Sequence, residues 1–407
     1  MKNNKQPEIR FPGFTQDWEQ RRLSDVADIV GGGTPSTNKE AYWNGDIDWY
    51  SPAEIGEQRY VSGSQKKITE LGLQKSSAKL LPIGTVLFTS RAGIGNTAIL
   101  AKEGTTNQGF QSIIPNKELL DSYFIFSKTD ELKRYGEVTG AGSTFIEVSG
   151  KQMAKMLILV PSLSEQIQIG SFFKKLDDIT ALHQQELTAL KETKQSFLQK
   201  MFPKEGEKVP EIRFPGFADD WEQRKLGNIA KVTTGKAFSS LDFDENGEYL
   251  VVTNKNIQDE NNGLVSTGDR INVSNTELLS KYQLNGKNIL VTMDGVNIGK
   301  VGRYSNDKAV LAQRVGRLNS NQLDFVYALV INPQFREQMN KLSVGNAIKH
   351  ISLKQISEYS ICIPNSSEEQ KNIGDFFKQL DNYIALHQRE LDLLKETKKA
   401  FLQKMFV

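Results

Sequence analysis

The chain contains two copies of its own framework, and this duplication limits the folds open to it. Residues 7–23 (PEIRFPGFTQDWEQRRL) and 210–226 (PEIRFPGFADDWEQRKL) differ at three of 17 positions. Residues 165–202 and 369–406 form a second pair, identical at 26 of 38 positions. Self-similarity at a nearly constant offset is typical of a structure built from repeated units. The 407 residues also exceed one ordinary domain, so the sequence predicts two similar domains.

The blocks between the near-copies, about residues 24–161 and 227–364, share only sparse patterns. One is VLFTSRAGIGN, from Val86, against ILVTMDGVNIGK, from Ile289. Short β-branched runs such as VLFTS, YLVVT and NILVTM are separated by Gly, Asn and Pro, and they predict strands. The segments YFIFSKTDELKRY and FVYALVINPQFREQM predict amphipathic helices. Each block is therefore expected to be a compact, β-rich globule with some helix.

The second pair of near-copies predicts two long helices. In both copies, seam residues recur at alternating steps of three and four over about four heptads, the a/d rhythm of a coiled coil. The predicted seam residues are Leu176, His183, Leu187, Leu190 and Phe197 in the first copy, and Leu380, His387, Leu391, Leu394 and Phe401 in the second. Stripes of this kind cannot stay exposed, so we expect the two helices to pack antiparallel.

Both helices have a recognisable start. Ser162 with Glu165, and Ser366 with Glu369, have the S-x-x-E spacing of a capping box. The apolar runs MLILVP and YSICIP end in proline just before these serines and predict buried strands.

The expected fold class is therefore α+β: two β-rich α/β globular domains joined by two long antiparallel helices in a coiled coil, with pseudo-two-fold symmetry. The expected boundaries are 1–161 and 204–364 for the globular domains, and 162–203 and 365–407 for the helical regions. A seam of about 29 residues spans on the order of 43 Å at 1.5 Å per residue. This length is near the 34 to 36 Å of one turn of B-DNA, so the helices could act as a ruler.

Composition limits the classes of function. With 38% hydrophobic and 25% charged residues and no apolar run of about 20 residues, the chain predicts no membrane span. The N-terminus lacks a signal-peptide core, and the one cysteine, Cys362, lies in an apolar run, so we expect a cytoplasmic protein. The formal net charge is only +2, so any nucleic-acid surface must be a local basic patch.

Several motifs together resemble type I restriction-modification specificity subunits over essentially the whole chain. They are GGGTPSTNKEAYWNGDIDW (31–49), the strand before EQxxI, the LDxxIALHQxEL helix and the LKETKxxFLQKMF ending of each half. The resemblance implies that each variable block is a target recognition domain reading one half of a bipartite DNA site. It also implies that the helices space the half-sites and dock two methyltransferase subunits, with ATP-dependent restriction subunits in the full complex. The second block shows KVTTGKAFSSLDF in place of TPxxxxYWxG, so only its strand pattern transfers.

Catalytic motifs are incomplete, and neither a cofactor nor a metal is expected. Asn332-Pro333-Gln334-Phe335 imitates the adenine-binding tetrapeptide of methyltransferases, but proline at a helix start is the better interpretation. Gly31 to Gly33 and Gly93 to Gly95 lack the spacing of nucleotide-binding loops, which favours turns. The chain is therefore predicted to be a non-catalytic subunit.

The histidines leave alternatives open. His183 and His387 occupy equivalent seam positions, where they could bind a metal, although a polar pair that sets the register is favoured. His350, next to Lys349, faces either phosphate or solvent. Tyr42 and Trp43 favour a core or loop-anchoring role over base stacking.

Candidate DNA contacts are polar residues that follow predicted strands, where hydroxyl, amide and guanidinium groups can reach base edges and phosphates. They are Ser90, Arg91, Asn107 and Gln108 in the first block, and Asp294, Asn297, Lys300, Gln313, Arg314 and Lys349 in the second. Two other functions stay open: a self-sufficient DNA methyltransferase, which would bind S-adenosylmethionine alone, and an independent DNA-binding or scaffold protein. The long apolar seams argue against independence.

Overall fold

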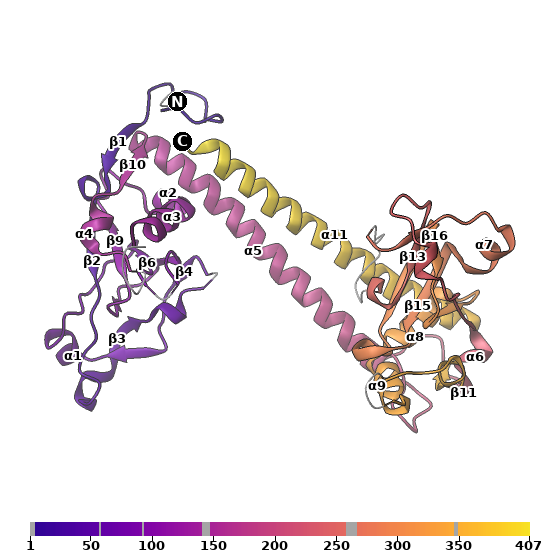
Figure 1. The fold of residues 1–407 in the computed structure, drawn as a ribbon. Helices are drawn as coiled ribbons and strands as arrows, with labels where there is room; N and C mark the ends of the chain where they lie inside the picture. The colour runs from indigo at the N-terminus through magenta and orange to yellow at the C-terminus, as the bar shows by residue number, and fades with distance from the viewer. Residues whose placement is uncertain (1–4, 57, 92, 141–146, 258–266, 346–348) are drawn as a thin grey trace. The chain divides into compact units, whose positions relative to one another are not determined.

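The computed structural model describes residues 5–56, 58–91, 93–140, 147–257, 267–345 and 349–407, drawn with their elements in Figure 1. The chain forms two compact units, Met1–Leu182 with Leu391–Val407, and His183–Glu390. The long helices α5 (Leu163–Lys200) and α11 (Ser367–Met405) each contribute one part to each unit. The four-segment division drawn from the sequence, which sets the helices apart as regions of their own, therefore stays a prediction.

The first unit is built on mixed sheets. A five-stranded sheet has the order β2 (Ala27–Gly31), β9 (Gln111–Pro115), β6 (Val86–Phe88), β7 (Thr97–Leu100) and β4 (Tyr60–Val61). A three-stranded sheet has the order β5 (Lys66–Ile68), β3 (Trp43–Tyr50) and β8 (Thr105–Thr106). The short helices of this unit are α1 (Glu70–Gln74), α2 (Ser122–Ser127), α3 (Thr129–Gly140) and α4 (Gly150–Ala154).

The second unit contains one six-stranded mixed sheet. Its order is β12 (Lys231–Thr234), β17 (Val315–Asn319), β15 (Gln283–Thr292), β16 (Val301–Leu311), β13 (Tyr249–Val252) and β14 (Arg270–Ile271), with β13 and β16 parallel. The helices of this unit are α6 (Leu226–Ile229), α7 (Thr276–Tyr282), α8 (Leu323–Ile331), α9 (Pro333–Leu342) and α10 (Leu353–Ser357).

Each of the near-copies 7–23 and 210–226 contains a strand that pairs with the strand preceding a long helix. Strands β1 (Glu19–Arg22) and β11 (Glu222–Lys225) pair antiparallel with β10 (Leu157–Val160) and β18 (Ser360–Ile363). Just before these strands, Trp18 and Trp221 are each 1% exposed. The repeated segments therefore connect the beginning of each globular domain to the strand at its end.

The capping boxes predicted at the two helix starts are only half present. Ser162 accepts a hydrogen bond from the Glu165 amide at 3.4 Å, but the Glu165 carboxylate does not return to the cap. It receives Nε and Nη2 of Arg10 at 2.7 and 2.8 Å. In the second unit, Arg213 binds Glu369 in the same way at 2.6 and 2.9 Å. Because a bidentate guanidinium is a stronger partner than a backbone amide, each glutamate joins its helix to the near-copy of its unit, residues 7–23 or 210–226.

A glycine in each long helix allows close packing against the domain. A Cβ placed on Gly170 would lie 2.5 Å from Asp121 Oδ1, and one on Gly374 would lie 2.6 Å from the Phe325 amide nitrogen. Glycine in a helix costs about 1 kcal/mol relative to alanine, so its presence at equivalent positions reflects this contact. The contact brings α2 against α5 in the first unit, which Figure 1 also shows, and α8 against α11 in the second.

Within each unit the two long helices run antiparallel, as predicted. In the first unit, Phe172 packs edge-on to Phe401 at 5.0 Å between ring centroids, and Asp177 pairs with Lys398 at 2.6 Å. Residue numbers on α11 therefore fall as those on α5 rise. In the second unit, Lys194 pairs with Asp381 at 2.6 Å and Phe197 packs on Phe376 at 5.1 Å.

None of the ten predicted seam residues is exposed. Leu187 and Leu391 are buried, and the other eight are half-buried: Leu176, His183, Leu190, Phe197, Leu380, His387, Leu394 and Phe401. Half-burial is expected for a two-helix seam, since only two helices are available to cover it.

Two predicted single helices are each divided in the structure. The first breaks at Lys128, between α2 and α3, where the lysine amino group lies over the rings of Trp18, Phe124 and Phe406 and pairs with Glu131 at 2.5 Å. The second breaks at Asn332, which caps α9 with Pro333 in its first turn. The helix-start interpretation of Asn332-Pro333 is therefore confirmed. Amphipathic character is wrong for α8, since Phe325 to Val330 are all buried.

Within the described part of the chain, no helix combines the length and the apolar character needed to cross a membrane.

Candidate nucleic-acid interface

A hairpin and two neighbouring loops form one framework in the first unit. After β6, the Gly95 amide donates to the Thr89 carbonyl at 3.0 Å and closes the hairpin to β7. The Ser90 amide donates to the Gly109 carbonyl at 2.8 Å, and the Ser90 carbonyl accepts from the Val148 amide at 3.0 Å. Residue 90 therefore holds the hairpin, the loop before β9 and the segment before α4 together.

The second unit repeats these three backbone hydrogen bonds with other side chains. The Gly299 amide donates to Thr292 at 2.9 Å, between β15 and β16. The Met293 amide donates to Arg314 at 3.2 Å, and its carbonyl accepts from Ile351 at 2.9 Å. The two units thus share a loop skeleton although their loop sequences differ.

A glycine allows a close backbone approach beside this skeleton in each unit. A Cβ on Gly32 would lie 2.0 Å from the Asn107 carbonyl oxygen, and one on Gly235 would lie 2.0 Å from that of Leu311. The sequence predicts a turn at Gly31 to Gly33, and the structure shows that glycine is needed at position 32 because the backbone of Asn107 lies so close. Gly235 occupies the equivalent position in the second unit. The sequence did not reveal this equivalence, because the second block has one glycine where the first has three.

The structure brings together the four candidate residues of the first unit, but not all of them at the surface. Ser90 is 0% exposed, so in this conformation its hydroxyl does not reach solvent. Arg91 is half-buried beside it. Asn107 is half-buried, and its side-chain oxygen accepts the Gly109 amide at 2.7 Å. Gln108 is exposed and hydrogen-bonded to the Thr34 hydroxyl. Gln108 and Arg91 are therefore the residues of this set best placed to meet a ligand.

In the second unit, two side chains, those of Arg314 and His350, meet at the carboxylate of Asp294. Asp294, with a side chain 12% exposed, accepts Nη1 of Arg314 at 3.0 Å and lies 3.0 Å from His350 Nδ1. The Arg314 side chain is 60% exposed and its backbone has φ +67°, a left-handed conformation unusual for a residue other than glycine. Asp294 therefore serves as an anchor, while the Arg314 guanidinium is presented outward.

The other candidates surround this anchor. Asn297, Gln313 and Lys349 are exposed, and the Lys349 carbonyl accepts the Gly295 amide at 3.0 Å. Val296, at the hairpin tip, is 96% exposed, and the sequence reasoning missed it because it selected only polar residues. An exposed methyl-bearing side chain of this kind can contact a thymine methyl group.

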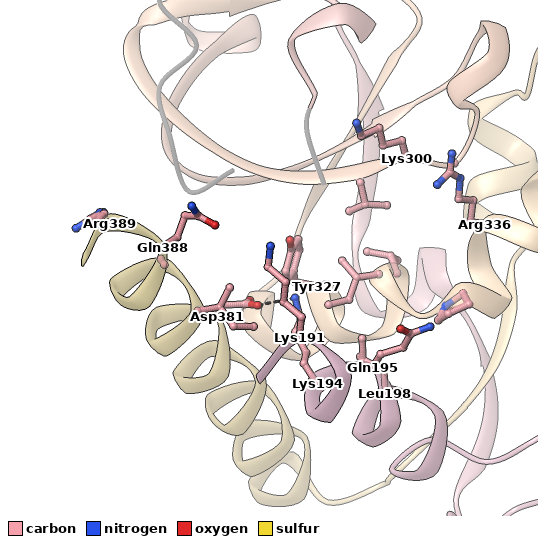
Figure 2. Close-up of a pocket in the computed structure, with 17 residues that line it drawn as sticks. Lys191, Lys194, Gln195, Leu198, Lys300, Tyr327, Arg336, Asp381, Gln388 and Arg389 are labelled. Atoms are coloured by element: carbon pink, nitrogen blue, oxygen red, sulfur yellow. Dashed lines mark ion pairs between the residues drawn. The ribbon is translucent and has the colours of Figure 1, made fainter. Parts of the chain in front are cut away.

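Lys300, which follows the hairpin tip, lines a basic pocket of about 700 Å³ (Figure 2). The pocket is lined by parts of α5, α8, α9 and α11 and by the Gly299–Val301 segment. Its charged side chains are Lys191, Lys194, Lys300, Arg336 and Arg389 against one carboxylate, Asp381. Asp381 pairs with Lys194 at 2.6 Å and with Arg303 at 2.8 Å. A pocket with this excess of positive charge fits a phosphate-bearing ligand.

Sequence reasoning did not find this pocket. It gave no role to Lys191, Arg336 or Arg389. The repeated KETK motif was a partial signal, but the meeting of four helices at one place depends on tertiary packing.

Trp43 has the anchoring role that the sequence favours. Its ring packs edge-on to Trp49 at 5.1 Å between centroids, and its indole nitrogen donates to the Ser36 carbonyl at 3.1 Å.

Comparison with known proteins matches both halves of the chain to one family. The model of the type I restriction modification DNA specificity domain matches residues 15–192 and again residues 218–396. The chain belongs to this specificity family. The two-domain resemblance inferred from the repeated motifs is therefore confirmed.

Two relatives agree with this membership, one of them over almost its whole length. The specificity subunit of the type I restriction enzyme MjaIX from Methanocaldococcus jannaschii is 28% identical, over 96% of this chain and 93% of its own length. The EcoR124I/EcoR124II specificity subunit of Escherichia coli is 32% identical over 40% of this chain and 41% of its own. The chain is thus a specificity subunit and not a catalytic one, as predicted.

A solved structure shows the same fold. The S subunit of a type I restriction-modification system from M. genitalium has a TM-score of 0.62 at 16% identity, covering 99% of both chains. The α+β class with two long helices is therefore confirmed for this specificity subunit.

Proposed function

We propose that each recognition domain of this specificity subunit reads one half of a bipartite site in double-stranded DNA, and that the long helices set the distance between the half-sites. The observation that carries the proposal is the shared loop skeleton, in which Thr89-Ser90 and Thr292-Met293 make the same three backbone hydrogen bonds in their units. Equal skeletons that present different side chains are expected of two modules with one docking mode and two sequence preferences. Acting on DNA, such a protein works in the cytoplasm.

In the second domain, one set of residues reads bases and another binds phosphates. Arg314, Asn297, Gln313 and Lys349 surround the Asp294 anchor and read base edges. Lys300, with the basic pocket behind it, holds the backbone. Asp294 and His350 keep the Arg314 guanidinium oriented, which reduces the entropy lost when it forms a bidentate contact.

This division predicts different results for two alanine variants. Arg314→Ala should weaken binding of the cognate duplex by about 1–3 kcal/mol and relax discrimination at one base pair. Lys300→Ala should weaken cognate and unrelated duplexes about equally and reduce the salt slope by about 1. Fluorescence anisotropy of the assembled complex at several salt concentrations measures both.

The matched control is Lys281→Ala on α7, an exposed lysine paired with Glu277. It should leave both affinities unchanged. If Arg314→Ala affects cognate and unrelated DNA equally, Arg314 does not read a base. If neither variant differs from the control, this face does not contact DNA.

The helices also carry equivalent apolar residues outside the seam. Ile179 and Leu182 on α5 are 44% and 53% exposed, and the corresponding Tyr383 and Leu386 on α11 are 57% and 49% exposed. Exposed apolar residues repeated at equivalent positions suit two copies of one partner. We assign them to two methyltransferase subunits, one in each unit, with ATP-dependent restriction subunits completing the complex.

Charge substitution at these sites tests the docking. Leu182→Asp and Leu386→Asp should each lose one methyltransferase subunit, and the double variant should lose both, because a carboxylate cannot enter an apolar interface without a partner. Native mass spectrometry of the co-expressed complex reads the stoichiometry. Gln184→Asp, an exposed position on another side of α5, should retain two subunits. A double variant that still binds two subunits would place docking elsewhere.

A further inference from the structure

Four metal-binding side chains meet at the seam inside the second unit. His183 and Glu186 lie on α5, and His387 and Glu390 lie on α11. The donor atoms of His183, Glu186 and His387 all lie within 4.8 Å of one another. Glu390 completes the group, since its Oε2 is 3.6 Å from His183 Nδ1 and 3.9 Å from His387 Nδ1.

The arrangement has two-fold character, because the duplication supplies the same motif twice. HQQE (183–186) and HQRE (387–390) place histidine and glutamate three residues apart on each helix. Glu186 Oε2 repeats the distances of Glu390, 3.9 Å to His183 Nδ1 and 3.6 Å to His387 Nδ1. Each imidazole is therefore flanked by one carboxylate of its own helix and one of the other helix.

The imidazole nitrogens that face the carboxylates are buried without hydrogen-bond partners. Among the described residues, Nδ1 of His183 and Nδ1 of His387 are both buried polar atoms without a hydrogen bond. The two rings lie 5.6 Å apart between centroids. A simple polar pair in the seam would be expected to form a hydrogen bond, and buried polar atoms without one are rare and need an explanation.

The geometry points to a divalent transition-metal site, with zinc as the best fit, that joins the two long helices. Two neutral imidazoles and two carboxylates are a nitrogen–oxygen donor set of the kind that zinc accepts in tetrahedral geometry, and the two carboxylates balance its charge. At metal–ligand distances of about 2.0–2.2 Å, tetrahedral donors lie about 3.4 Å apart. The observed histidine–carboxylate distances of 3.6 and 3.9 Å need only a small contraction.

The protein can make this contraction at little cost. The Glu186 and Glu390 side chains are 45% and 44% exposed, so they can turn inward, whereas the histidines at 23% and 24% are already held in the seam. A bound ion would fix the register of α5 against α11, because any slip would separate the two motifs. The sequence alone favours His183 and His387 as a polar pair without a metal. The buried Nδ1 atoms without hydrogen bonds are the reason to favour a metal site instead.

Cobalt titration of the untagged full chain after chelator treatment tests the site. One equivalent of Co²⁺ should give the strong visible absorption of a four-coordinate ion, and one equivalent of Zn²⁺ should displace it. Glu390→Gln keeps a half-exposed side chain and should fold, and it should weaken binding more than about 100-fold, beyond the usual effect of second-shell changes. The His183→Gln/His387→Gln double variant should abolish the signal.

His350→Gln is the matched control, since it removes the third histidine of the chain, which lies outside the seam. It should leave the cobalt spectrum unchanged. Absence of a four-coordinate spectrum in the natural chain overturns the proposal and leaves the histidines as a polar pair. An equal signal in Glu390→Gln, or in a double variant that is folded by circular dichroism, also overturns it.

Discussion

Replacing Arg213 with alanine is expected to destabilise the second unit by about 3–5 kcal/mol, the usual cost of leaving one member of a buried ion pair without its partner. The Arg213 side chain is 12% exposed and the Glu369 side chain 1%. The hydrogen bond to Glu369 raises the pKa of Arg213, so the guanidinium stays charged throughout the physiological range. Urea unfolding, with hydrogen exchange of peptides covering β11 and the start of α11, measures the loss.

Arg224→Ala is the matched control, because it breaks an arginine–glutamate pair at the surface of the same unit. Arg224 lies 2.6 Å from Glu222, with both side chains about half exposed at 51% and 50%. Exposed pairs contribute about 0–1 kcal/mol, so this variant should be nearly neutral. Similar losses in Arg213→Ala and Arg224→Ala would show that the buried pair does not fasten the domain to its helix. Arg213→Lys should be intermediate, since lysine keeps the charge but not the bidentate geometry.

Exchange of the second recognition domain should have the largest effect on function. Replacing residues 227–359 with the corresponding block of another family member should abolish methylation at the natural site. It should create a site that keeps one half and changes the other. These limits leave β11 and β18 together, and they also leave the Arg213–Glu369 pair. The donor block needs a close backbone approach opposite Gly374, where an added Cβ would lie 2.6 Å from the Phe325 amide nitrogen.

The reciprocal exchange of residues 24–156 is the control for this design. It keeps β1 paired with β10 and should change the other half-site only. A chimera that loses all methylation is judged by co-purification with the methyltransferase subunits. If it still assembles, the idea of independent reading by the two domains is wrong.

The two long helices and the strands that precede them could be predicted from the sequence because the pattern for each occurs twice in the chain. The seam rhythm and the strands before each helix rest on local periodicity, and the structure places Leu187 and Leu391 inside the seam. The proline at position 333 was correctly identified as a helix start, since its preference is local.

Other features were beyond prediction because their partners are far away in the chain. Glu165 has the spacing of a capping box, yet its carboxylate binds Arg10, 155 residues earlier. Ser90 has the polar side chain and loop position of a DNA contact, but it is fully buried at the centre of the loop skeleton. The break at Lys128 depends on a cage of rings that includes Phe406, near the end of the chain. Local patterns cannot show contacts of this kind.

Methylome sequencing tests the central claim most directly, in cells that carry the natural chain, the chain with residues 227–359 exchanged, or no copy of it. Two separate reading domains predict one bipartite adenine-methylation motif with the natural chain, a motif changed in a single half with the exchanged chain, and no such motif without the chain. A motif that changes in both halves on exchange, or one that persists when the chain is absent, would contradict it.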